Sequence, residues 1–135
     1  MADYFHLNVE RNHLLNLSTL GLAHLGDGVF EVMVRSWLCL HSTAKVKDLH
    51  RATVHYVAAP AQAERFERIA PVLTEEEDAV FRRGRNTAPH SVPKAATRSQ
   101  YQTATGLEAL FGWLYLQGRT ERLNELFEMM MEGEC

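Results

Sequence analysis

Apolar residues recur at intervals of three and four along most of this chain, which is the spacing of one face of an α-helix. The first such run follows Ser18 or Thr19, either of which can cap a helix, and it continues to about Leu40. Its apolar positions are Leu22, Leu25, Val29, Val32, Met33, Trp37 and Leu40. Strand-like alternation of β-branched residues is scarce throughout, so the pattern predicts an all-α helical bundle.

Five further helices are predicted, and local signals mark several of their ends. Pro60 suits the first turn of a helix. Thr74 followed by Glu77 is a capping-box pattern, and Gly118 suits the end of the long apolar helix before it. A segment rich in Pro and Ser, residues 86–96, is expected to be an exposed loop. The five helices are expected at about residues 45–56, 60–69, 75–85, 99–116 and 120–131.

Composition places this chain among ordinary globular proteins. Its 135 residues, 46% of them hydrophobic and 23% charged, suffice for one domain with a real core, expected over residues 1–135 with its core at about 18–131. No apolar run reaches the roughly 18 residues that span a bilayer, and the N-terminus does not resemble an export signal. Cys39 and Cys135 are too few for a disulfide framework. A cytoplasmic protein without membrane contact is therefore expected.

Two carboxylates stand out because each interrupts an apolar helical run. Asp27 lies in Leu22–Glu31, and Glu108 lies in Gly106–Leu116. Burial of an unpaired carboxylate is costly, so each needs a cation. Glu31, four residues after Asp27, shares its helix face. These acids can share a divalent cation such as Mg²⁺, which prefers oxygen ligands. Alternatively, Asp27 pairs with a basic residue such as Arg35 or Arg51.

The net charge of −3 conceals a basic segment. No Asp or Glu occurs between Asp78 and Glu108, an interval that carries five of the 14 Lys and Arg residues. Arginine matches phosphate oxygens well, so this segment can form a polyanion-binding surface. It can also be a solvated helix end whose arginines complement the helix dipole. The residues expected to bind a polyanion are Arg82, Arg83, Arg85, Asn86 and Lys94.

Other chemistries lack their sequence patterns. The seven histidines and two cysteines show no His-x-x-x-His or Cys-x-x-Cys spacing, which argues against zinc. No serine lies in a nucleophile elbow, and no glycine-rich phosphate loop occurs.

Several of these stretches together resemble the ribonuclease III domain. Leu25–Glu31 resembles its signature helix, and Glu108–Leu116 resembles its second acidic helix. The whole chain is similar to Mini-III, the short ribonuclease III-like enzymes without a double-stranded RNA-binding domain. The likeness covers about residues 18 to 127 in the same order. Further matching stretches are Leu49–Thr53, Ala59–Ala63, Thr74–Glu77, Arg82–Asn86 and Val92–Lys94.

The resemblance implies a homodimeric all-helical endonuclease that cleaves double-stranded RNA with Mg²⁺, for which Mn²⁺ can substitute. It identifies Asp27 and Glu108 as metal-binding catalytic acids, and Glu31 as a third catalytic residue that follows the Mini-III pattern. It also implies maturation of the ends of the large-subunit (23S) ribosomal RNA precursor, with a ribosomal protein as a further partner.

The chain departs from full-length ribonuclease III at three acidic positions, which here hold Leu20, Ala23 and Thr105. Mini-III shares these departures, so they do not indicate inactivity, but a second metal ion per site is not implied. Position 24, an apolar dimer contact in much of the wider family, is His24 here.

The hypothesis from sequence is a metal-dependent nuclease in which the basic segment holds the phosphates and 2′-hydroxyls of an A-form duplex. The alternative is a non-catalytic RNA-binding or ribosome-assembly factor with the same fold. Loss of the metal-binding acids would be expected there, so retention of Asp27 and Glu108 favours the enzyme.

Overall fold

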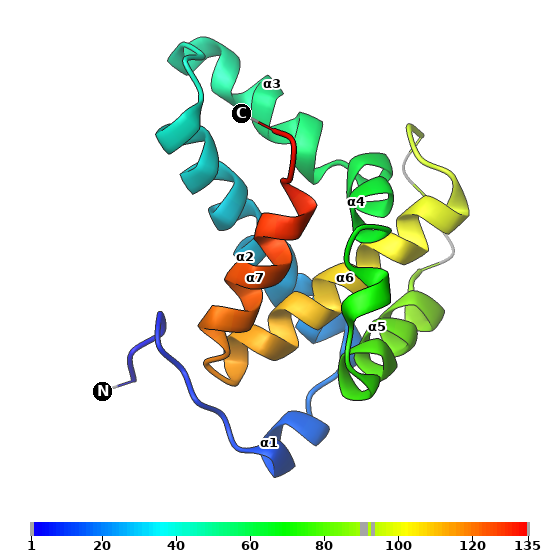
Figure 1. Cartoon of the computed structure of the whole chain (residues 1–135). Helices are drawn as coiled ribbons and strands as arrows, with labels where there is room; N and C mark the ends of the chain where they lie inside the picture. Colours follow the sequence, from blue (N-terminus) through cyan, green and yellow to red (C-terminus); the bar gives the residue numbers. More distant parts are fainter. Residues whose placement is uncertain (1, 90–91, 93, 135) are drawn as a thin grey trace.

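The computed structural model describes residues 2–89, 92 and 94–134, and the regular structure of these residues is entirely helical (Figure 1). The elements follow one another as α1 (Arg11–Leu15), α2 (Thr19–His41), α3 (Val46–Val57), α4 (Ala59–Phe66), the 3-10 turn η1 (Ala70–Val72), α5 (Glu75–Thr87), α6 (Arg98–Leu116) and α7 (Thr120–Met130). None of the helices in the described part of the chain is both long and apolar enough to cross a bilayer. The predicted all-α class is confirmed.

All six helices predicted from sequence are present, with differences at their ends. The helix expected to reach residue 69 ends at Phe66, and the following chain turns through η1, which contains Pro71. Proline lacks the backbone N–H that a continuing helix needs, so the helix stops before it. Helix α5 continues to Thr87, two residues beyond the expected end. The short helix α1 was not predicted, because five residues are too few to show a period.

Side-chain caps explain where three helices begin. The Ser18 hydroxyl accepts a hydrogen bond from the Gly21 backbone N–H at 2.9 Å, which caps α2. Thr74 and Glu77 form the predicted capping box of α5. A second capping box, formed by Thr97 and Gln100, begins α6. These caps satisfy backbone donors that a helix leaves free in its first turn.

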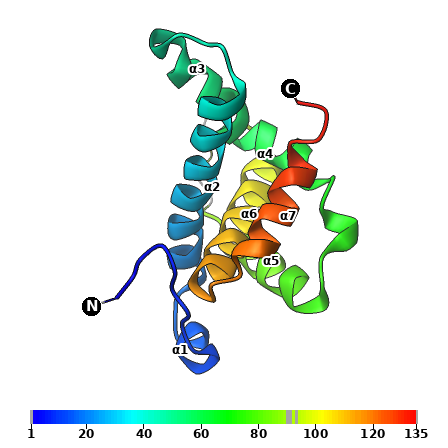
Figure 2. The same cartoon turned by 60° about the vertical axis from the view of Figure 1, so that its left-hand side comes forward.

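Helix α6 lies at the centre of the bundle, with α2, α4, α5 and α7 packed around it (Figure 2). Leu107, Leu110, Phe111 and Leu114 of α6 are fully buried. Phe111 meets Phe30 of α2 edge to face, with ring centroids 5.7 Å apart. Because α6 is buried on most of its sides, most of its residues are apolar. This burial does not explain the few polar residues of α6.

Glycines allow α6 to approach two neighbouring helices with direct backbone contact. A Cβ on Gly26 of α2 would lie 1.6 Å from the Glu108 carbonyl oxygen, and one on Gly112 would lie 2.1 Å from the Leu22 carbonyl oxygen. Gly84 of α5 and Gly106 of α6 make the equivalent close crossing on another side of α6. Side chains at these crossings would push the helices apart, so glycine sets the distance between them.

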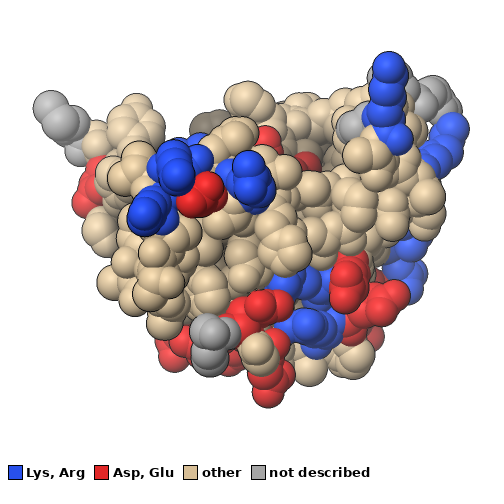
Figure 3. All heavy atoms as spheres, turned by 90° about the horizontal axis from the view of Figure 1, so that it is seen from above, with Lys and Arg blue, Asp and Glu red and all other residues tan. Residues whose placement is uncertain are grey.

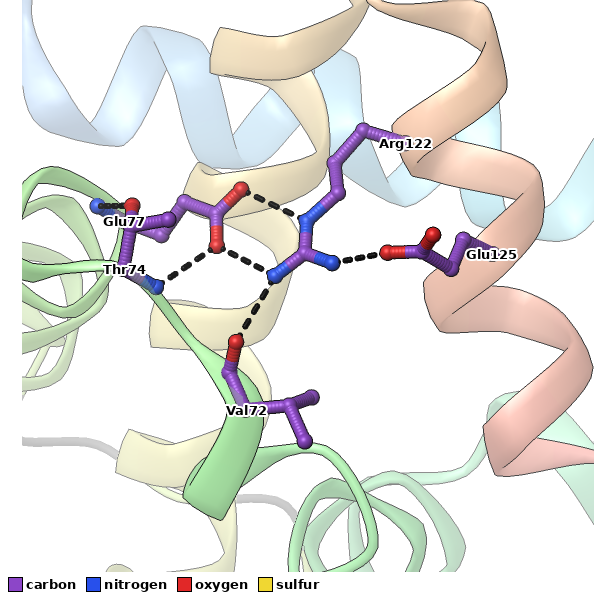
Figure 4. A network of polar contacts seen from close by, with 5 residues as sticks. All are labelled: Val72, Thr74, Glu77, Arg122 and Glu125. Atoms are coloured by element: carbon purple, nitrogen blue, oxygen red, sulfur yellow. Dashed lines mark hydrogen bonds and ion pairs between the residues drawn. The ribbon is translucent and has the colours of Figure 1, made fainter.

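A buried ion pair joins α5 to α7 (Figure 4). Arg122 donates to both carboxylate oxygens of Glu77, at 2.9 and 2.8 Å, and to the Val72 carbonyl oxygen at 2.9 Å. It also pairs with Glu125. Burial raises the pKa of the Glu77 carboxyl, but the bonds from Arg122 and the Thr74 N–H outweigh burial and hold that pKa below its ordinary value. Glu77 therefore caps α5 and also anchors α7 to it.

Candidate functional site

The Gly26–Gly112 crossing brings Asp27 and Glu108 side by side. Asp27 follows Gly26 on α2, and the Glu108 backbone is what Gly26 contacts on α6. Their carboxyl groups are close enough to interact directly. Asp27 is exposed to solvent and Glu108 is half-buried. The expected meeting of two acids from two helices is therefore what the structure contains.

Two adjacent carboxylates repel each other when both are ionised. Burial of Glu108, the charge of Asp27 and the contact with the Asp27 side chain together raise the pKa of Glu108 to about 8. A protonated Glu108 can donate a hydrogen bond to Asp27, which relieves the repulsion. A cation placed between the two groups would relieve it as well, without the proton. The site is thus built to attract positive charge.

Gln62 of α4 is the third polar side chain at this place. It is 1% exposed, and its amide nitrogen donates to the Val57 carbonyl oxygen at 2.7 Å and to Glu108 Oε2 at 3.3 Å. The bond from Gln62 acts to lower the pKa of Glu108, against the effects of burial and of Asp27. Gln62 Oε1 is buried, and the described part of the chain offers it no hydrogen-bond partner. Such an orphaned acceptor costs about 1–3 kcal/mol.

The alternative that Asp27 pairs with Arg35 does not hold in this structure. Arg35 forms an ion pair with Glu31 instead, at 2.9 Å and four residues away on α2. Arg51 is exposed on α3. Within the described ranges, no ion pair is found for Asp27, and its neighbour is another acid. Glu31 is engaged with Arg35, and among the described residues it does not form a three-acid group with Asp27 and Glu108 that could hold a metal ion.

The donor set suits a hard divalent cation. Asp27 and Glu108 offer carboxylate oxygens, and Mg²⁺ commonly binds one or two protein carboxylates while it keeps several waters. The described residues contain no group of three or more His, Cys, Asp or Glu side chains arranged to enclose a metal ion. The residues present therefore fit a half-open oxygen site of the Mg²⁺ type and do not form a closed structural metal centre.

The predicted RNA-binding residues lie at the end of α5 and after it. Arg83, Asn86 and Lys94 are exposed. Arg82 pairs with Asp78 at 2.8 Å, while Arg85 lies over the Phe81 ring and donates to Asn86 Oδ1 at 3.2 Å. His90 and Pro93, which belong to the same expected loop, lie outside the described residues. Arg82 and Arg85 are thus engaged within the chain, whereas no ion pair is found for Arg83 among the described residues.

Basic side chains form separate groups on the molecular surface (Figure 3). In this view one group lies on the side of α3, and another lies on the side where α5 and α6 are joined. Lys45, Lys47 and Arg51, on or beside α3, are also exposed, and none of them was predicted from the sequence to bind RNA. Asp and Glu side chains are most evident along the lower edge of the view. Positive charge is thus available on more than one element.

Gln62 is the site residue that sequence reasoning missed. A signal for it exists: Gln62, Phe66 and Ile69 recur at four and three, and all are buried. A polar residue in an apolar stripe normally marks a specific hydrogen-bond partner. What the sequence does not show is that this partner is Glu108, because the two residues are 46 positions apart.

Comparison with known proteins agrees with these features. The Ribonuclease III domain model matches residues 20–119. Mini-ribonuclease 3 of Symbiobacterium thermophilum is 46% identical over 114 residues, covering 84% of this chain and 88% of the relative. Mini-ribonuclease 3 of Clostridium tetani is 37% identical over 134 residues, covering 97% and 88%.

A solved structure shows the same arrangement of helices. The crystal structure of a protein from Fusobacterium nucleatum superposes with a TM-score of 0.80 and 28% sequence identity, covering 89% of this chain and 96% of the other. The helical bundle with its two adjacent acids is a ribonuclease III domain. Within that class, the chain belongs to the Mini-ribonuclease 3 family. The resemblance stated from sequence is confirmed, and with it the expectation of an endoribonuclease of the ribonuclease III type.

Proposed function

We propose that this protein is a Mg²⁺-dependent endoribonuclease that cleaves double-stranded RNA, with Mn²⁺ able to replace Mg²⁺. The observation that carries the proposal is the contact between Asp27 and Glu108 in a member of the Mini-ribonuclease 3 family. Among the residues that the structure describes, neither acid forms an ion pair with a basic side chain. A cation bound between the two carboxyl groups would favour the form in which both are ionised. Asp27 is exposed to solvent at this helix crossing, so a ligand can approach the pair from outside.

Asp27 and Glu108 would hold the divalent cation through their carboxylate oxygens. When bound, the cation activates a water molecule and neutralises charge on the scissile phosphodiester. Glu31 lies one helical turn from Asp27 and is assigned a supporting catalytic role, for which it would have to leave Arg35. Arg82, Arg83, Arg85, Asn86 and Lys94 would bind phosphates and 2′-hydroxyls of the duplex, which is recognised mainly by its A-form shape.

The family supports a homodimer in which each subunit cleaves one strand. It also supports maturation of the ends of large-subunit ribosomal RNA precursor, with a ribosomal protein that presents the substrate. Since the proposed RNA contacts are mostly to phosphates, affinity is expected to fall steeply with salt concentration.

The test is incubation of the purified protein with double-stranded RNA and Mg²⁺, with Asp27→Asn as the comparison. Wild type is expected to cut the duplex and the variant to leave it intact. If clean wild-type protein bound RNA but cut neither a generic duplex nor precursor ribosomal RNA, the non-catalytic alternative would replace this proposal. If Asp27→Asn cut as fast as wild type, the site assignment would be wrong.

A further inference from the structure

The amide of Gln62 connects two helices through one nitrogen atom. The Val57 carbonyl oxygen at the end of α3 can only accept a hydrogen bond, so the amide nitrogen must face it at 2.7 Å. That requirement fixes the orientation of the amide. The same nitrogen therefore faces Glu108 Oε2 at 3.3 Å, and the bond to Glu108 follows from the fold.

The unpaired oxygen of Gln62 shows that the amide is not there to fill space. Gln62 is 1% exposed, and its Oε1 has no partner among the described atoms. An apolar side chain of similar volume would leave no orphaned acceptor at this position. The fold tolerates that oxygen while the nitrogen contacts two acceptors. The feature that this position requires is thus the N–H donor.

We propose that Gln62 is a positioning residue for the metal site. Its N–H donor, from α4, holds the Glu108 carboxylate of α6 in the orientation in which it meets Asp27 of α2. Residues that hydrogen-bond a metal-binding carboxylate restrict its rotamers and thereby raise its affinity for the ion. The inference rests on the proposed function, because it assumes that Asp27 and Glu108 bind a divalent cation.

Substitution of Gln62 by methionine separates this role from a structural one. Gln62→Met keeps the volume and removes the donor. Gln117→Met is a matched control, since the Gln117 amide donates to the Trp113 carbonyl oxygen at 3.0 Å and contacts no acid in the site. If Gln62 only supported the fold, Gln62→Met would lower the melting temperature and leave the metal affinity of the folded protein unchanged.

The experiment is calorimetric titration of wild type and both variants with Mn²⁺, together with their melting temperatures and their affinity for double-stranded RNA in EDTA. For Gln62→Met the Mn²⁺ dissociation constant is expected to rise about tenfold or more. RNA affinity in EDTA should stay unchanged, and Gln117→Met should bind Mn²⁺ as wild type does. Equal Mn²⁺ affinity in folded Gln62→Met and wild type would overturn the inference.

A second variant covers the case in which Gln62→Met does not fold. Gln62→Asn keeps an amide that is too short to reach both acceptors, and it is expected to weaken Mn²⁺ binding in the same direction. Wild-type affinity in folded Gln62→Asn would overturn the inference, and so would failure of both variants to give a cooperative melt, because Gln62 would then be needed for folding. Failure of the proposed function looks different: wild type itself would not bind Mn²⁺, or Asp27→Asn would bind it equally well.

Discussion

Gly26 on α2 lies directly against the backbone of Glu108 on α6, so closely that a Cβ on Gly26 would lie 1.6 Å from the Glu108 carbonyl oxygen. This contact sets the distance between the two acids, because Asp27 is the next residue along α2. The spacing of the candidate site is therefore set by a residue without a side chain.

Gly26→Ala is expected to destabilise the protein by about 2 kcal/mol or more, because the added methyl group must separate two helices in backbone contact. Gly28→Ala is the matched control, since a Cβ there meets nothing within 4 Å. Alanine is the better helix former, so Gly28→Ala should raise the free energy of unfolding by about 0.5–1 kcal/mol. Urea denaturation measures both, and equal stability of the two variants would contradict the close crossing.

Asp27→Asn is expected to raise the melting temperature of the metal-free protein by a few degrees while it abolishes cleavage. The charge of Asp27 disfavours ionisation of Glu108, so its removal lowers the cost of holding Glu108 at this site. Stability is commonly gained when a functional site is neutralised in this way. Glu31→Gln serves as the control, because it breaks only the exposed pair with Arg35, which is worth about 0–1 kcal/mol. Melting curves in EDTA that show Asp27→Asn no more stable than Glu31→Gln would count against the repulsion.

The pH dependence of stability follows from the pKa of Glu108, which lies at about 8 in the folded protein and at its ordinary 4.5 in the unfolded chain. Between these values the folded protein holds a proton that the unfolded chain has released. The contribution of Glu108 is therefore fully present below the lower value and is lost as pH rises through the higher one. In EDTA, the melting temperature of wild type should fall between about pH 5 and pH 9 more than that of Glu108→Gln. Parallel curves of melting temperature against pH would show that the pKa of Glu108 is not raised in the folded protein.

Arg122→Met is expected to cost about 3–5 kcal/mol, because it leaves the carboxylate of Glu77, which is 1% exposed, without its cation. The comparison is Arg11→Met, which removes the partner of Glu76 from an exposed ion pair and should cost about 1 kcal/mol or less. Chemical denaturation of both variants provides the measurement. A similar small loss in both would mean that the buried pair does not anchor α7.

Arg83→Ala is expected to weaken binding of double-stranded RNA without a change in Mn²⁺ affinity. The slope of log affinity against log salt concentration should become shallower by the contribution of about one phosphate contact. Arg82→Ala should have a smaller effect because Arg82 is engaged with Asp78. Arg119→Ala, outside the acid-free segment, is the control. Binding isotherms at several salt concentrations measure the slope, and an unchanged affinity for Arg83→Ala would remove this arginine from the interface.

The sequence predicted what local patterns determine. Six helices follow from periodicity, and the capping box of α5 follows from Thr74 and Glu77. The meeting of Asp27 and Glu108 was also anticipated, because an acid in an apolar helical run needs a partner and two such runs were present. That each of these acids has a polar or charged partner could be inferred because burial of an unpaired charge is costly.

Long-range partners could not be predicted in the same way. Periodicity shows that Glu77 is placed in a helix, but it does not show that the cation opposite is Arg122, 45 residues later. Such choices depend on how the helices cross, and here the crossing is fixed by glycines that carry no hydrophobic signal.

The claim that Asp27 and Glu108 bind one divalent cation is tested most directly by anomalous scattering from a crystal of the protein soaked with Mn²⁺. We expect a peak between the carboxylate oxygens of Asp27 and Glu108 that is absent from crystals of Asp27→Asn. A peak only at other residues would contradict a metal site at these two acids. So would well-ordered carboxylates with no ion between them at the Mn²⁺ concentration that supports cleavage.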